Sequence, residues 1–245
     1  MSENWMLDEL AHAGPEHLDL EFVAGYDRKQ GYPDPAGDLE LLRRYGVGER
    51  STVIDFGAGT GRFALAAARR FGYVVAADVS PVMLENVRTR AAEAGVTNLR
   101  CVKAGFLSYE NDGQPADAVH TRNALHHLPD FWKAIALSRI AGMLRPGGIM
   151  LLHDLIYSFP PDEAEKVFSR WFAGASDDPS AGYTAEDYAE HIRTEYSTFS
   201  WLLEPMIDAA GFDIVESDTS TRVFASYTCV RRSQPSGAVT DVATS

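Results

Sequence analysis

Cysteine is scarce in this chain. Cys101 and Cys229 are the only two among 245 residues, and they lie far apart, outside any Cys-x-x-Cys or Cys/His cluster. This pattern excludes a disulfide-stabilised scaffold and argues against a structural zinc site. Basic residues are also in deficit, since 22 Lys and Arg stand against 35 Asp and Glu and give a net charge of −13. A protein that holds nucleic acid by bulk positive charge is therefore not expected.

Long hydrophobic runs are missing as well. No apolar stretch approaches the roughly 20 residues that a membrane span needs. Residues 1–10 carry three acids instead of the basic start of a signal peptide. We therefore expect a cytoplasmic protein with no membrane partner. With 45% apolar and 23% charged residues, a chain of this length can bury a core as one large globular domain.

From residue 51 onward, short apolar strands alternate with helices. Five strands are predicted at residues 52–55, 73–77, 99–103, 116–121 and 149–153, with helices at 63–71, 81–94 and 130–144 between them. This alternation predicts βαβ units and a parallel sheet with helices on both faces. Two further strands, at 212–215 and 222–230, predict a hairpin at the C-terminal end.

The composition divides the chain into three parts. Residues 1–47 are polar and broken by glycine and proline, which predicts a helical cap segment. Residues 48–231 form the main domain, and an insertion at about 155–200 interrupts its alternation. From 232 to 245, Ser, Pro, Gly and Thr dominate, which predicts a disordered tail.

The most informative segment is the glycine-rich loop DFGAGTG at residues 55–61. A strand that turns sharply into a helix needs glycine where the backbone adopts unusual angles or a ligand approaches it. The next strand ends at Asp78, 23 positions after Asp55 (78 − 55), where doubly wound sheets hold a ribose diol. The alternatives are a simple tight turn for the loop and, for Asp78, an acid at the helix start beside Ser80.

The spacing of the glycines distinguishes between two classes of cofactor-binding loop. Dinucleotide-binding folds use G-x-G-x-x-G, whereas this loop has the pattern G-x-G-x-G at residues 57–61. The loop resembles motif I of the class I S-adenosylmethionine-dependent methyltransferases. Segments 123–130 (NALHHLPD) and 144–148 (LRPGG) resemble that family's segments after the fourth strand and before the fifth. The resemblance covers roughly residues 51–154 and implies a three-layer Rossmann-like sandwich whose mostly parallel, seven-stranded sheet ends in an antiparallel hairpin.

The resemblance also implies how the cofactor, S-adenosyl-L-methionine, is bound. Gly57 and Gly59 would line its methionine part, and Asp55 would hold the turn and, through water, the amino end. Asp78 would bind the ribose hydroxyls, and Asn123 would face the cofactor from the end of the fourth strand.

The adenine side departs from the family's pattern. Val79 and Met83 would pack on the adenine ring. The family usually has Gly-Asp after the third strand, but this chain has Gly105-Phe106. An aromatic side chain there can stack on the adenine, although the hydrogen bond from an acid is missing.

Methyl transfer is an in-line displacement, so the protein mainly has to place the acceptor in a dry pocket. If the acceptor is a hydroxyl, a base helps, and histidine is the default. The candidates are His126 and His127 beyond the fourth strand and His153, with Asp154, at the end of the fifth; of these, His126 and His153 are predicted as catalytic. As alternatives, His126 belongs to a segment common in the family, and His153 packs beneath the insertion.

The insertion is rich in aromatic residues, which predicts a lid and an apolar pocket for a small organic acceptor. Nucleic acid is not expected as a substrate, because residues 121–124 (TRNA) lack the Asn- or Asp-Pro-Pro-aromatic tetrad of base-amino methyltransferases. We expect no metal, although Asp154 leaves a magnesium site open. Two other functions remain: a protein that binds S-adenosylmethionine without transferring methyl groups, and a nicotinamide-dependent dehydrogenase, which the glycine spacing disfavours.

Overall fold

The computed structural model describes residues 5–31 and 34–233. Most of the predicted disordered tail, from residue 234 onward, lies outside the described residues. Ahead of the sheet, the chain forms α1 (Glu9–His12), η1 (Pro15–Leu18), α2 (Leu20–Lys29) and α3 (Ala36–Arg44).

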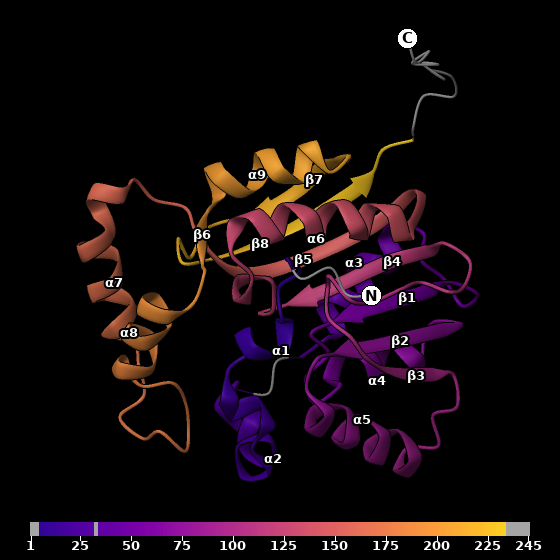
Figure 1. The fold of residues 1–245 in the computed structure, drawn as a ribbon, viewed down its shortest axis with the longest axis horizontal. Helices are drawn as coiled ribbons and strands as arrows, with labels where there is room; N and C mark the ends of the chain where they lie inside the picture. The colour runs from indigo at the N-terminus through magenta and orange to yellow at the C-terminus, as the bar shows by residue number, and fades with distance from the viewer. Residues whose placement is uncertain (1–4, 32–33, 234–245) are drawn as a thin grey trace.

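The strands form one mixed sheet in the order β3-β2-β1-β4-β5-β8-β7 (Figure 1). Their bounds are β1 (Thr52–Phe56), β2 (Tyr73–Asp78), β3 (Leu99–Lys103), β4 (Ala116–Arg122), β5 (Leu144–Tyr157), β6 (Thr198–Phe199), β7 (Phe212–Asp218) and β8 (Phe224–Arg231). Strands β1 to β5 pair in parallel, and β8 runs antiparallel to β5 and β7. The predicted parallel sheet with a C-terminal hairpin is confirmed.

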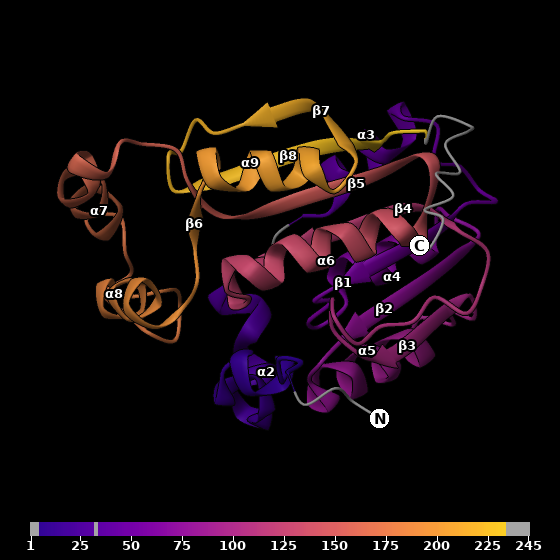
Figure 2. The same cartoon turned by 45° about the horizontal axis from the view of Figure 1, so that its top comes forward.

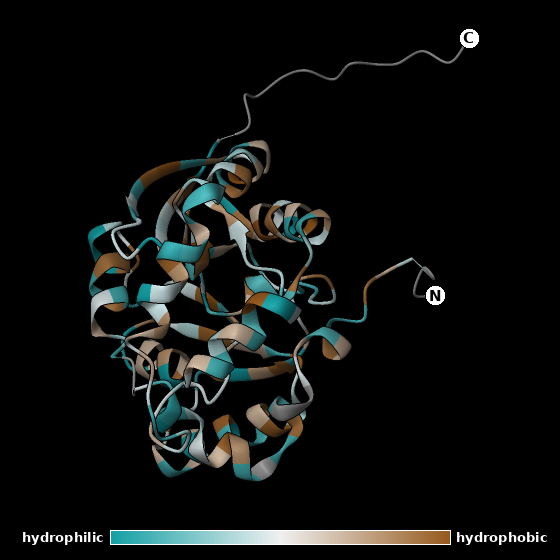
Figure 3. Cartoon of the chain, turned by 90° about the vertical axis from the view of Figure 1, so that its left-hand side faces the viewer, coloured by the Kyte–Doolittle hydropathy of each residue, from teal (hydrophilic) through white to brown (hydrophobic). Residues whose placement is uncertain are grey.

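Helices cover both faces of this sheet. The helices after β1 are α4 (Arg62–Ala68), α5 (Pro81–Glu93), η2 (Leu125–His127), α6 (Asp130–Met143), η3 (Pro161–Glu163), α7 (Ala164–Phe172), α8 (Ala185–Thr194) and α9 (Ser200–Ala209). Helices α6 and α9 lie side by side over one face (Figure 2). Helices α3, α4 and α5 contribute to the buried cluster on the other face. In Figure 3 the helices carry both polar and apolar segments, as elements with one buried face do.

Alternation along the strands builds the two cores. Val53 and Val74 belong to the cluster beneath α3, α4 and α5, while their neighbours Ile54 and Val75 belong to the cluster beneath α6 and α9. All four side chains are at most 3% exposed. A central strand buried on both faces reads as a continuous apolar run, which is why the sequence indicates these strands clearly.

The predicted start of the helix at Ser80-Pro81 is confirmed. Ser80 accepts a hydrogen bond from the amide of Met83 (3.1 Å) and caps α5, which begins at Pro81. Strand β5 is longer than predicted and runs to Tyr157. The sequence also missed β6, a two-residue strand that pairs with the far end of β5, because so short a strand has no period to detect.

The insertion forms a separate lobe beyond the end of β5. Helices α7 and α8 stand away from the sheet on the left of Figure 1. Tyr157, Phe159, Val167 and Val223 form a small buried cluster at the base of this lobe. Helix α8 begins with a capping box in which Thr184 and Asp187 bind each other's backbone amides. In the described part of the chain, no helix combines the length and apolarity needed to cross a bilayer.

Candidate active site

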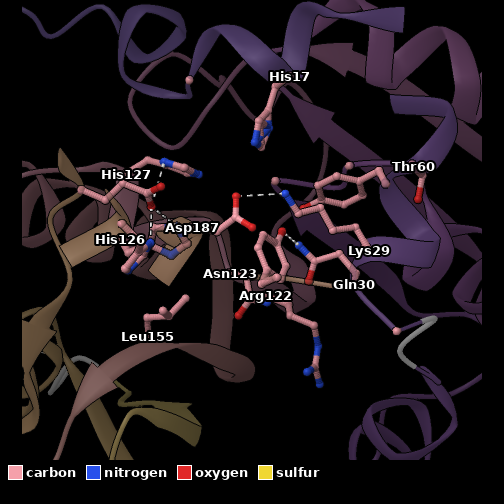
Figure 4. A pocket seen from close by; sticks show the side chains of 18 of the residues that line it. His17, Lys29, Gln30, Thr60, Arg122, Asn123, His126, His127, Leu155 and Asp187 are labelled. Carbon is pink, nitrogen blue, oxygen red and sulfur yellow. Dashed lines mark hydrogen bonds and ion pairs between the residues drawn. The ribbon is translucent and has the colours of Figure 1, made fainter. Parts of the chain in front are cut away.

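A cavity of about 1140 Å³ opens at the carboxyl ends of β1, β4 and β5. Its walls come from the glycine loop, from the segment after β4, from α2 and from the insertion. Figure 4 shows His126 and His127 on one side of it, with Lys29, Gln30 and Thr60 on the other. Ligands of open α/β sheets bind at this edge. The cavity is therefore the place where the predicted site residues have to meet.

The glycine loop needs its glycines. Gly57, Gly59 and Gly61 have φ values of 64°, 53° and 80°, in the left-handed region that side chains rarely adopt. A Cβ on Gly57 would lie 2.3 Å from the Cβ of Ala124, so the loop passes directly against the segment after β4. Gly57 and Gly59 both line the cavity. The backbone thus lies bare where the methionine part of the cofactor was predicted.

Asp55 lies beneath this loop in a buried network that the sequence did not reveal. Its Oδ1 is 2.7 Å from Nδ1 of His120, whose Nε2 is 3.3 Å from Oδ2 of Asp38. Arg122 donates to the same oxygen of Asp38 (2.9 Å). The His120 ring stacks on Phe63 at 3.6 Å between centroids. This network fixes the orientation of the Asp55 carboxylate at the floor of the cavity.

Asp78 is buried and holds the loop rather than facing the cavity. Its Oδ2 accepts the amide of Gly59 (2.8 Å), and its Oδ1 accepts the amide of Ser80 (2.8 Å). The N-terminal segment lies over this end of β2: Ser80 Oγ donates to the carbonyl of His17 (2.6 Å). A Cβ on Gly59 would lie 3.7 Å from the ring of Tyr26. Asp78 therefore lies beside the loop as predicted, but the N-terminal segment covers it.

The residues predicted to pack on adenine are also enclosed. Met83 and Phe106 are 1% and 5% exposed, and Val79 is half-buried. Phe106 stacks on Phe56 with 5.1 Å between ring centroids, so it belongs to the core. None of the three lines the cavity as described. An open aromatic wall for the adenine is therefore not formed in this arrangement.

Glu9 supplies a carboxylate where the family's acid is missing. Its side chain accepts the amides of Leu107 (3.0 Å) and Ser108 (3.1 Å), and Ser108 Oγ donates to it (2.7 Å). The same carboxylate packs against Gly105. No local pattern indicates this contact, because almost a hundred residues separate its partners.

The methionine side of the site fits S-adenosylmethionine, and the adenosine side is covered. Asn123 lines the cavity with a φ of 50°, and its buried Oδ1 has no hydrogen-bond partner in the described part of the chain. An unsatisfied buried acceptor is costly unless a ligand or water completes it. Together with the glycine cradle and the fixed Asp55, this oxygen suits a ligand that carries an amino group and a positive charge. Asp78 can reach the ribose only when the segment above it shifts.

His126 has both ring nitrogens engaged. Nδ1 lies 2.5 Å from Oδ1 of Asp154, and Nε2 lies 2.8 Å from Oε2 of Glu195. Burial would lower the pKa of His126, but the two carboxylates outweigh it and raise the pKa to about 9. Burial and the nearby His126 lower the pKa of His127 to about 3. At neutral pH, His126 is therefore protonated and His127 is neutral.

His153, the other predicted base, lies elsewhere. Its Nδ1 is 2.6 Å from Oγ of Ser226, and it lines a second cavity of about 250 Å³ instead of the large one. Burial and the charge of Arg122 lower the pKa of His153 to about 4. The structure thus does not bring the two predicted histidines together.

The N-terminal segment and the insertion meet across the cavity. Lys29 forms an ion pair with Asp187 (3.2 Å) and lies 4.8 Å from the centre of the Tyr183 ring. Gln30 donates to the hydroxyl of Tyr183 (2.6 Å). The predicted lid therefore closes against α2, a pairing that more than 150 intervening residues hid from sequence patterns.

Comparison with known proteins finds methyltransferases. The profile of a methyltransferase domain family matches residues 53–148. An uncharacterized methyltransferase of Mycobacterium tuberculosis is 38% identical over 98 residues, 40% of this chain and 47% of that protein. The chain thus spans about half the length of this curated relative. An uncharacterized methyltransferase of Geobacillus kaustophilus is 28% identical over 208 residues, 81% of this chain and 90% of that protein.

The fold is shared with a solved methyltransferase. Magnesium protoporphyrin IX methyltransferase from Synechocystis, crystallised with bound SAM (S-adenosylmethionine), superposes with a TM-score of 0.63 at 15% identity. The superposition covers 94% of this chain and all of that one (100%). The domain match, the relatives and the glycine loop together show that residues 53–148 are similar to methyltransferase domains, and the chain shares the fold of the solved methyltransferase.

Proposed function

We propose that this protein transfers the methyl group of S-adenosylmethionine to a small organic acceptor by in-line displacement. The observation that carries the proposal is the bare glycine backbone, Gly57 and Gly59, at the wall of a 1140 Å³ cavity. The cofactor supplies an electrophilic methyl group on a sulfonium. The chain then has to hold both reactants in line and keep water out.

The methionine end of the cofactor would lie against the glycine loop. Asp55, oriented by His120, would attract its amino group, and Asn123 Oδ1 would accept a hydrogen bond from it. On the ribose side, Asp78 would exchange part of its contact with the loop for the sugar hydroxyls. That exchange requires the segment that carries His17 and Tyr26 to move away from the end of β2.

The acceptor would lie between the loop and the insertion. Trp171 and Tyr188 line that part of the cavity and stack at 4.2 Å between ring centroids. Tyr183 and Tyr196 line it as well. Aromatic side chains in the wall suit a small organic molecule with an apolar part, and the polar groups beside them would fix its orientation. Because the net charge is −13, we do not propose nucleic acid as the substrate. We also propose that the protein acts in the cytoplasm.

We assign proton removal to neither predicted histidine. His126 already carries a proton at neutral pH, because the carboxylates raise its pKa to about 9. His153 lines the other cavity. The reaction would depend on placement, which suits an acceptor that loses its proton readily or has none to lose.

The experiment is label transfer from methyl-labelled S-adenosylmethionine into a panel of small-molecule fractions. We expect labelled product from the wild type and much less from Asp78→Asn, with Glu216→Gln as a surface control that keeps full activity. Tight cofactor binding without transfer to any fraction would instead favour the alternative, a binding protein without methyl-transfer activity.

A further inference from the structure

Imidazole nitrogens converge on one carboxylate oxygen in the cavity wall. Oε2 of Glu195 lies 2.8 Å from Nε2 of His126, 2.8 Å from Nδ1 of His191 and 3.8 Å from Nδ1 of His127. The donor atoms of His126, His127 and Glu195 all lie within 4.8 Å of one another. All four residues line the large cavity.

The cluster joins two distant parts of the chain. His126 and His127 lie in η2, which follows β4. His191 lies in the last turn of α8, and Glu195 follows four residues later, so the two share one face. The backbone also connects these parts, since the amide of Tyr196 donates to the carbonyl of His126 (3.0 Å). The donor atoms are therefore held together by the fold.

The short contacts at the centre of the cluster leave hydrogen bonding incomplete. Glu195 Oε2 and His127 Nδ1 are buried and make ion-pair contacts, yet neither has a hydrogen bond of normal geometry within the described residues. Buried polar atoms in this condition call for a partner, which can be an ion.

The ring nitrogens of His126 and His191 that point away from Glu195, in contrast, have close polar partners. Nδ1 of His126 lies 2.5 Å from Asp154, which also accepts the amide of Leu125 (2.7 Å). Nε2 of His191 lies 2.7 Å from Oγ of Ser197. Histidines that bind metals use their second ring nitrogen in this way, toward a carboxylate or another polar group.

The charge of the cluster favours a cation. Asp154 is 1% exposed, and the carboxylate of Glu195 is also largely enclosed. Within the described residues, the ion pairs of these two acids involve only histidines. Two enclosed negative charges are expensive to bury, and the proton that His126 holds in the metal-free protein balances only one of them. A divalent cation would balance both.

We propose that His126, His127 and Glu195 form a binding site for a divalent transition-metal ion, with Zn²⁺ the best match to two imidazoles and one carboxylate. Zn²⁺ accepts this ligand set, and three protein ligands leave a tetrahedral ion one further position. Asp154 and His191 are positioning residues that orient His126 and Glu195. Where the proposed methyl transfer also holds, the open position would take an oxygen or sulfur atom of the acceptor.

The test is calorimetric titration of the full-length protein with Zn²⁺ after treatment with EDTA and removal of the chelator. We expect one equivalent to bind, and binding at least ten-fold weaker in His127→Gln and Glu195→Gln. His153→Gln is the matched control, since it removes a histidine outside this cavity, and it should bind as the wild type does. Wild-type protein that takes up no zinc, or ligand variants that bind it as tightly as wild type, would overturn the proposal.

Crystals of the wild type grown with Zn²⁺ give a second measurement that does not depend on how the variants fold. Anomalous scattering at the zinc edge should place one ion among His126, His127 and Glu195. A peak elsewhere on the chain, or none, contradicts the assignment. Binding of S-adenosylhomocysteine in the presence of EDTA is measured separately, so failure of the metal site and failure of the proposed methyl transfer are distinguishable.

Discussion

Nδ1 of His120 lies 2.7 Å from Oδ1 of Asp55, the acid that precedes the glycine loop. Both side chains are almost fully buried, at 3% and 2% exposure. The far side of the imidazole reaches Asp38 in α3 (3.3 Å). One histidine of β4 therefore links the acid before the glycine loop to α3.

This link predicts a pH dependence of stability. Burial alone would lower the pKa of His120, but the charges of Asp55 and Asp38 raise it above 6.5. A histidine with a raised pKa in the folded state contributes its full stabilisation below its unfolded pKa and loses it as the pH rises through the folded value. We expect the free energy of unfolding, measured with urea in the presence of EDTA, to fall as the pH rises from about 6.5.

His120→Gln should reduce that fall. His153→Gln is the control, because the pKa of His153 is lowered to about 4 and it titrates below this range. Equal pH dependence in the wild type and in His120→Gln would show that the buried network carries no such charge.

Gly57→Ala should destabilise the glycine loop. The new Cβ would meet the Cβ of Ala124 at 2.3 Å, and the φ of 64° is unfavourable for alanine by roughly 1–2 kcal/mol. We expect lower stability in urea unfolding and loss of cofactor binding in calorimetry. Gly142→Ala is the matched control: it lies in α6 with nothing within 4 Å of a new Cβ. That change should leave binding intact and stabilise by up to about 1 kcal/mol. If both variants bind alike, the loop does not hold the cofactor.

Glu9→Ala should loosen the N-terminal segment. Its carboxylate accepts the amides of Leu107 and Ser108, and alanine cannot replace these bonds. Hydrogen exchange followed by mass spectrometry should show faster exchange at residues 105–109 and 9–12. Glu85→Ala, which removes an exposed pair within α5, should change neither region. Unaltered protection in Glu9→Ala would mean that other contacts hold the segment.

Much of the fold could be predicted because its signals are local. The apolar run ending at Asp78 and the Ser80-Pro81 pair mark a strand end and a helix start within a few residues. The glycine loop carries its conformation in its own residues, since only glycine readily adopts three left-handed angles so close together. For the same reason the conformation of Gly57 and Gly59, which line the cavity, could be predicted from the sequence.

The rest depended on contacts between distant segments. Glu195 meets His126 only because the insertion folds back over the cavity, and no local pattern encodes that path. Likewise, Asp38 gave no sign that it would share His120 with Asp55. The position of Asp78 at the end of a strand beside the loop was predictable. The segment with His17 and Tyr26 that covers it has weak periodicity, so this contact was not.

Calorimetric titration with S-adenosylhomocysteine and, separately, with NADH decides which cofactor the large cavity binds. We expect the wild type to bind one equivalent of S-adenosylhomocysteine and no NADH. In folded Asp78→Asn, binding should weaken by roughly 1–3 kcal/mol, because the amide accepts through one oxygen where the carboxylate would offer two to the ribose hydroxyls. No binding of S-adenosylhomocysteine, or binding of NADH in its place, would contradict the assignment of the cavity.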